Sequence, residues 1–164
     1  MWVAKKSDLN AMSTMSTPWG ACGVSSDAQK LVTNFHRDAG TSANGGRNPS
    51  SGTTTFKCGN SGWGYRHIVA RNHDDQFVSM AAGTNQNWRD IADLGMAKAL
   101  NDPARITYRR PPTHTFCYSA EISLYNKDTG QLVRKKKVQV VIGGSDYNVV
   151  SAYPSNSHCS MATS

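Results

Sequence analysis

Apolar positions spaced three and four residues apart predict three helices in the first two thirds of the chain. The first covers 26–39, where Ser26 and Gln29 form a capping box at its start. A second, short helix lies within 62–77. The third covers 87–100, with one apolar face and two aspartates near the end where the helix dipole favours negative charge.

After Pro103 the apolar residues recur at every second position, which is the period of a strand. A turn signal at 128–130, Asp-Thr-Gly, separates two of these alternating runs. The predicted fold class is therefore α+β, with N-terminal helices packed on one face of a C-terminal antiparallel β meander built from 105–153. The predicted strands are 106–109, 116–125, 138–142 and 147–150.

The pattern divides the 164 residues into one domain and two flanking segments. Residues 1–24 have no clear period and are interpreted as an arm, residues 25–154 as the domain, and residues 155–164 as a tail. Within the domain, 40–62 is rich in Gly, Ser, Thr and Asn and is predicted to be a loop. The longest apolar run has four residues, so we expect neither a membrane-spanning helix nor an intact signal peptide.

Positive charge is concentrated in the part of the chain that is predicted to form strands. Residues 103–142 carry eight Lys or Arg against two acidic residues, which accounts for +6 of the net charge of +7. Lys135, Lys136 and Lys137 are consecutive within this stretch. Such a surface suits a polyanion, for example nucleic acid, or an anionic surface. A solvated basic face without a partner is the alternative that charge alone leaves open.

The four cysteines, Cys22, Cys58, Cys117 and Cys159, include no CxxC pair, so a structural zinc site is not expected. An even number of scattered cysteines in a small basic domain predicts two disulfides and, with them, an exported protein. Four reduced thiols are the alternative. Sequence leaves three pairings open; we expect Cys58–Cys117, joining the loop to the sheet, and Cys22–Cys159, joining the arm to the tail.

The residue types available for chemistry are histidine, hydroxyls and cations. The chain has no G-x-S-x-G, H-E-x-x-H or P-loop motif, and Glu121 is its only glutamate. Arg66, His67, Arg71 and His73 lie within eight residues. A metal-free ribonuclease needs such parts: a base for the 2′-hydroxyl, an acid for the leaving 5′-oxygen, and donors for the phosphorane. A solvated helix face whose histidines only pack or cap is the alternative.

A second candidate group lies near the C-terminal end. Ser151 and Tyr153 alternate on a predicted strand, so both side chains point to the same face. Two hydroxyls on one face can bind a phosphate or a base. An ordinary polar strand face is the alternative.

The order of these groups resembles that of a known family. The chain has His67-Ile68-Val69-Ala70-Arg71, then a helix that ends at Asn101-Asp102-Pro103, and finally Ser151-Ala152-Tyr153-Pro154. EndoU-like bacterial ribonuclease toxins, within the barnase–EndoU–colicin–RelE class, have His-Ile-x-x-Arg-His on a helix. A second helix and antiparallel strands follow, ending in Ser/Thr-x-Tyr-Pro. The resemblance covers residues 62–154.

Position 72 departs from the family's pattern. The second histidine of the motif is replaced by Asn72, and His73 follows it. Asparagine has no proton that titrates near neutral pH and cannot act as an acid or base. Either His73 has taken over the role, or the chain is an inactive form. On a continuous helix one residue rotates the side chain by about 100°, so His73 would not simply replace a histidine at 72.

The resemblance implies an endoribonuclease toxin that cleaves RNA by 2′-OH transphosphorylation to a 2′,3′-cyclic phosphate, with no metal or other cofactor. His67 and either Asn72 or His73 would form the catalytic pair. Ser151 and Tyr153 would bind the scissile phosphate or the neighbouring base. The residues expected to hold the RNA backbone are Arg66, Arg71, Lys135, Lys136 and Lys137.

The resemblance also implies partners and a location. RNA, with tRNA as one candidate, would be the substrate, and a cognate immunity protein would cover the histidine cleft. The protein would be secreted, or delivered extracellularly as part of a larger protein, and would act in the target-cell cytoplasm. The alternative is a secreted, disulfide-stapled basic module that binds nucleic acid or an anionic surface without catalysis. A hydrolase of another class is a third interpretation.

Overall fold

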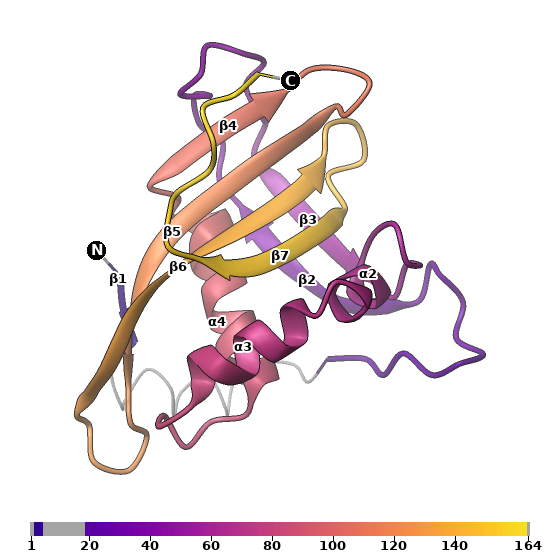
Figure 1. Cartoon of the computed structure of the whole chain (residues 1–164). Helices are drawn as coiled ribbons and strands as arrows, with labels where there is room; N and C mark the ends of the chain where they lie inside the picture. Colours follow the sequence, from indigo (N-terminus) through magenta and orange to yellow (C-terminus); the bar gives the residue numbers. More distant parts are fainter. Residues whose placement is uncertain (1, 5–18, 164) are drawn as a thin grey trace.

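The computed structural model describes residues 2–4 and 19–163 (Figure 1). These residues form an α+β fold with a five-stranded sheet, a two-stranded sheet and three helices. The elements, in chain order, are β1 (Trp2–Ala4), β2 (Leu31–Arg37), β3 (Gly52–Lys57), α2 (Tyr65–Ala70), α3 (His73–Ala81), α4 (Trp88–Asn101), β4 (Arg105–Arg109), β5 (Thr115–Tyr125), β6 (Leu132–Gly143) and β7 (Val149–Ser155).

The large sheet is built around the long hairpin of β5 and β6. These two strands pair antiparallel, and β7 adds antiparallel to the other side of β6. On its free side, β5 pairs antiparallel with β4 and parallel with β1. The antiparallel meander predicted after Pro103 is therefore confirmed. The complete sheet is mixed, because β1 adds in parallel from the segment interpreted as an arm.

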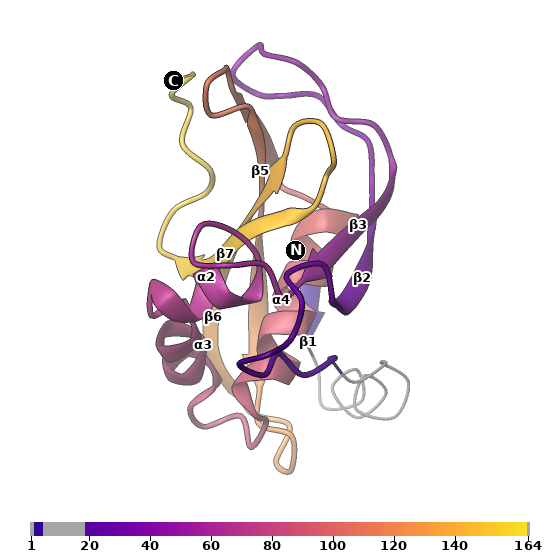
Figure 2. The same cartoon turned by 90° about the vertical axis from the view of Figure 1, so that its right-hand side faces the viewer.

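Helix α4 is the centre of the core. It packs against β5 and β6 on one side and against β2 on the other, and Figure 2 shows it between the two sheets. The helix begins where the sequence predicts, because the Asn87 side chain accepts a hydrogen bond from the Asp90 backbone N–H (3.0 Å). Gly95 allows α4 to approach β6 closely, since a Cβ there would lie 2.7 Å from a methyl group of Val138.

The predicted helix at 26–39 is wrong, because this region contains β2, which pairs antiparallel with β3. Phe35 and Arg37 are buried in strand alternation, and a register shift near the start of β2 brings Val32 into the core as well. This bulge gives the apolar residues a helix-like spacing. Ser26 accepts a hydrogen bond within a turn (2.9 Å) instead of capping a helix. Strand β3 lies inside the stretch predicted to be a loop.

The expectation of disulfides is confirmed, but the expected pairing is wrong. The bonds are Cys22–Cys58 and Cys117–Cys159. Each bond joins one of the flanking segments to the sheet that lies beside it. Which segment lies beside which sheet depends on the complete fold. Both flanking segments are therefore fastened to the domain. None of the helices within 2–4 and 19–163 is long and apolar enough to cross a membrane.

Candidate active site

Two short helices, in place of the single one predicted within 62–77, carry the histidine segment. α2 ends at Ala70, α3 begins at His73, and Asn72 between them has a left-handed backbone conformation with φ 59°. Asparagine is one of the few residues other than glycine that adopts this conformation readily. Because the chain turns at Asn72, the rotation expected along a continuous helix does not apply, and His73 starts a new helix in a new direction.

This turn brings His67, His73 and Tyr153 together. The ring centroids of His67 and His73 are 6.3 Å apart, and those of His73 and Tyr153 are 4.9 Å apart. The three residues come from α2, α3 and β7, and both helices pack against β7. Residues far apart in the sequence thus share one place in the fold.

Hydrogen bonds orient both imidazole rings. His67 Nδ1 lies 2.8 Å from the Ser61 carbonyl oxygen, and His73 Nδ1 lies 3.0 Å from Gln76 Oε1. Both oxygens can only accept, so Nδ1 of each ring is the donor and carries a proton. Nε2 of each ring is left to take or give a proton, which is the arrangement that acid–base catalysis requires.

Burial shifts the pKa values of His73 and Tyr153 in opposite directions. It lowers the pKa of His73 below the usual value of 6.5, and the charges of His67 and Arg71 act in the same direction, while the hydrogen bond with Gln76 opposes them. His73 is therefore mainly neutral at neutral pH. Burial raises the pKa of Tyr153, so its phenol keeps its proton, which it donates to Gln139 Oε1 (3.0 Å).

A cleft of about 850 Å³ extends from His67 across the large sheet. Gln139 and Val141 of β6 line it, whereas Val138 and Val140 lie in the core, so the cleft is on the face of the sheet opposite α4. No Asp or Glu is among the described residues that line it. Its arginine and histidine side chains are His67, Arg71, Arg105, Arg109 and His158.

The segment predicted to be a tail forms one wall of this cleft. Arg105 donates to the Cys159 carbonyl oxygen (3.1 Å), and Gln139 Nε2 donates to the Ser157 carbonyl oxygen (2.9 Å). The Cys117–Cys159 disulfide fixes the same segment to β5. Figure 1 shows the C-terminal chain, in yellow, passing along the sheet from the end of β7 towards β4.

The sequence does not single out His158, because the residue lies in the segment predicted to be a tail. It lines the cleft, and its Nδ1 is 2.9 Å from Ser119 Oγ. Burial lowers its pKa, and Lys137 and Arg105 lower it further. The neighbouring Cys159 was the one sequence signal that this segment returns to the sheet.

Besides the lysines at 135–137, four predicted site residues are not among those that line the cleft: Arg66, Asn72, His73 and Ser151. Ser151 stands opposite Val141 in the ladder, on the same face as Tyr153, but it is 6% exposed and its Oγ has no hydrogen-bond partner among the described residues. Arg66 turns towards the segment before β2 and donates to three backbone carbonyls. The side chain of Asn72 is exposed and caps no backbone group.

The lysine run is divided between two faces by the alternation of β6. Lys135 is exposed. Lys137 lies on the cleft side of the sheet, 3.5 Å from Glu121. Lys136 lies on the other side, where it donates to Asn156 Oδ1 (2.6 Å). The three side chains therefore do not form one binding surface. Among the described residues, no cluster of three or more His, Cys, Asp or Glu side chains could hold a metal ion.

Comparison with curated proteins finds relatives in Mycobacterium tuberculosis. The chain is 31% identical, over 140 residues and 83% of its length, to the uncharacterized protein Rv0739 of strain H37Rv. The match to the uncharacterized protein MT0764 of strain CDC 1551 has the same identity and extent. The chain spans about half the length of these relatives, 49%. No family model and no solved structure matches the chain.

Proposed function

We propose that the cleft is the active site of a metal-independent endoribonuclease. The observation that carries this proposal is that His67 and Tyr153 line a cleft with three arginines and, among the described residues, no carboxylate. The ring of His73 lies beside this cleft, 6.3 Å from that of His67 and 4.9 Å from that of Tyr153. Two imidazoles whose Nε2 atoms have no hydrogen-bond partner among the described residues suit the two proton transfers of RNA cleavage. Arginines without acidic neighbours suit a polyanionic substrate.

In this mechanism His73 is the general base and His67 the general acid. His73 takes the proton of the 2′-hydroxyl on Nε2, because its lowered pKa keeps it neutral. The 2′-oxygen attacks phosphorus, the bond from phosphorus to the 5′-oxygen breaks, and His67 in its imidazolium form protonates the departing 5′-oxygen. The products are a 2′,3′-cyclic phosphate and a 5′-hydroxyl. Arg71 lines the same end of the cleft and would stabilise the charge on the phosphorane.

The rest of the cleft would hold the RNA strand. Tyr153 offers a ring beside the catalytic pair on which a base can stack. Arg105 and Arg109 on β4 would bind backbone phosphates. In this proposal the second catalytic histidine is His73, and Asn72 forms the turn that orients His73 towards His67. The chain is then active without any substitution.

We further propose that the chain is the nuclease domain of an EndoU-like bacterial toxin. Two disulfides suit an oxidising compartment and delivery from outside the target cell. The chain matches only about half of its relatives' length, which fits a domain of a larger protein. An immunity protein that covers the cleft would need acidic residues to complement its arginines.

The test is cleavage of a labelled RNA, including tRNA, with and without EDTA, followed by identification of the product ends. We expect fragments with a 2′,3′-cyclic phosphate and a 5′-hydroxyl under both conditions. Loss of cleavage in EDTA would refute a metal-independent reaction. Tight RNA binding without any cleavage would favour the non-catalytic binding module instead.

A further inference from the structure

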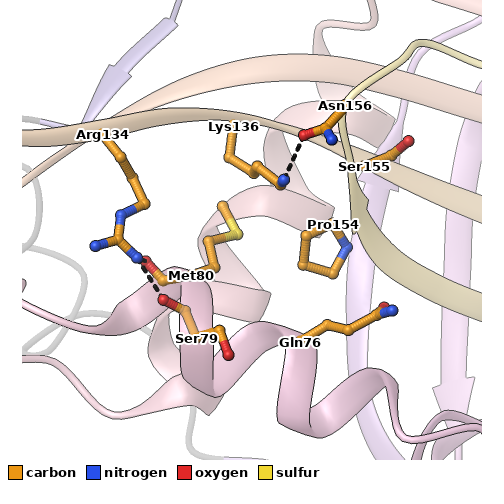
Figure 3. A pocket seen from close by; sticks show the side chains of 8 residues that line it. All are labelled: Gln76, Ser79, Met80, Arg134, Lys136, Pro154, Ser155 and Asn156. Atoms are coloured by element: carbon orange, nitrogen blue, oxygen red, sulfur yellow. Dashed lines mark hydrogen bonds between the residues drawn. The ribbon is translucent and has the colours of Figure 1, made fainter.

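A second pocket, of about 530 Å³, lies between α3, β6 and the end of β7 (Figure 3). We call it the Lys136 pocket. Arg134 and Lys136 of β6 are its cations, and no Asp or Glu is among the described residues that line it. Met80 of α3 and Pro154 of β7 turn their apolar side chains towards the same space as Lys136. The pocket therefore combines positive charge with an apolar surface, as a nucleotide requires.

The charges of the two cations are not neutralised within the described residues. Lys136 donates to the amide oxygen of Asn156 (2.6 Å). Arg134 donates to the backbone carbonyls of Ser79 and Met80. All three acceptors are neutral, and neither cation is in an ion pair with a carboxylate among the described residues. Both charges remain available to an anion.

The pocket adjoins the catalytic pair through two connections. Gln76 lines it and also accepts the hydrogen bond from His73 Nδ1 (3.0 Å). Pro154 follows Tyr153 on β7, so the two side chains point to opposite faces of the strand. A strand of RNA that leaves His73 around the end of β7 would enter this pocket next.

We propose that the Lys136 pocket binds a nucleotide of the RNA that flanks the cleaved bond, with its phosphate on Lys136 and Arg134 and its base or ribose against Met80 and Pro154. This inference rests on the proposed function, since it places a second nucleotide beside the reaction centre. It makes the substrate a single strand of at least several nucleotides that passes from one face of the sheet to the other.

The test compares the Lys136→Gln variant with Lys30→Gln, which removes an exposed lysine before β2. Cleavage is measured on a dinucleoside monophosphate and on a hexanucleotide. We expect Lys136→Gln to lower kcat/KM for the hexanucleotide by roughly tenfold, the lower end of what a hydrogen bond to a charged group contributes. The dinucleoside, which has only the cleaved phosphate, should react as before. Equal losses on both substrates, or the same loss in Lys30→Gln, would overturn the proposal.

A binding measurement separates this proposal from the proposed function. A hexanucleotide with 2′-O-methyl riboses cannot react, and the ¹³C-labelled methyl group of Met80 reports on the pocket by NMR. We expect the Met80 signal to shift on titration with this oligonucleotide and to respond more weakly in Lys136→Gln. If the Met80 signal shifts on titration but the protein cleaves no RNA, the proposed nuclease activity is refuted and nucleotide binding in the Lys136 pocket is supported. If the protein cleaves RNA but the Met80 signal does not shift, nucleotide binding in the Lys136 pocket is refuted and the nuclease activity stands.

Discussion

Asn72 is the residue on which the position of His73 depends. Its backbone is left-handed, with φ 59°, and its side chain is exposed, so its contribution is the turn between α2 and α3. In the EndoU-like pattern that the segment resembles, this position holds a histidine, and its replacement would by itself indicate a lost catalytic group. The structure offers a different explanation, because the turn it permits brings the next residue to His67 and Tyr153.

Substitutions at Asn72 should therefore act through backbone conformation. We expect Asn72→Gly to keep its cleavage rate, because glycine adopts the left-handed conformation without strain. Asn72→Val should lose stability by about 1–2 kcal/mol and also lose activity, since a β-branched side chain is strained there. Denaturant unfolding and cleavage assays measure the two effects. Asn72→His should not increase the rate; a rise of about a hundredfold would show that His73 is not the catalytic partner.

The ionisation of His73 gives a prediction about pH. A base must be neutral, and burial lowers the pKa of His73 below 6.5. We therefore expect kcat/KM to rise with pH along a limb whose midpoint lies below 6.5. NMR titration of the His73 ring in the free protein should give the same midpoint. A kcat/KM midpoint above 6.5 would contradict the assignment of His73 as the base. So would an NMR midpoint for the His73 ring that differs from the midpoint of the kcat/KM profile.

At the scale of elements, the sequence predicts those whose signals are local. The Asn87 cap, one apolar face and the stop at Pro103 place α4 correctly. Two-residue alternation identifies β4 to β7, but β6 begins at Leu132 and β7 continues to Ser155, beyond the predicted 138–142 and 147–150. The bulge in β2 gives its apolar residues the spacing of a helix, so the pattern there predicts a helix in place of a strand. The break at Asn72 could not be predicted, because asparagine is also compatible with an unbroken helix. The return of the C-terminal segment to the cleft depends on a disulfide pairing that sequence alone cannot determine.

The two disulfides provide a matched comparison between stability and function. They close loops of similar length, with sequence separations of 36 and 42, so each should stabilise the fold by up to about 4 kcal/mol. We expect Cys117→Ser/Cys159→Ser and Cys22→Ser/Cys58→Ser to lose similar amounts of unfolding free energy. Only the first pair should weaken RNA binding, because only Cys159 holds the wall of the cleft.

The affinity of both double variants for RNA is measured under conditions in which circular dichroism shows that both variants are folded. An equal loss of affinity in the two variants would indicate general loosening of the fold. No loss in Cys117→Ser/Cys159→Ser would mean that the C-terminal wall does not take part in binding.

At the scale of the whole molecule, the basic charge is distributed over two faces. Charge counting along the chain identifies the strands as basic but cannot separate the faces. Arg105 and Arg109 lie in the cleft, Lys136 lies on the opposite side of the sheet, and Lys137 is beside Glu121. If the proposed function holds, the arginines of the cleft are therefore the cations best placed to bind RNA near His67.

This distribution predicts which substitutions change the salt dependence of RNA binding. Replacing Arg109 by Gln should make the plot of log affinity against log salt shallower by roughly 0.7, the value for one phosphate contact on a single strand. Lys30→Gln, a charge-matched change outside both pockets, should leave the slope unchanged. Fluorescence anisotropy with a non-cleavable RNA gives both slopes. A slope that Arg109→Gln does not alter would place the RNA outside the cleft.

The most direct test of the account is the rate of RNA cleavage by the unaltered chain, by His67→Ala, by His73→Ala and by the double variant. We expect the unaltered chain to cleave and each single variant to be slower by ~10²–10⁴-fold, the usual contribution of a proton-transfer group. The double variant should be little slower than the slower single variant, because the two groups act as a unit. Undiminished cleavage in either single variant, or no cleavage by the unaltered chain while it binds RNA, would contradict the pairing of His67 with His73.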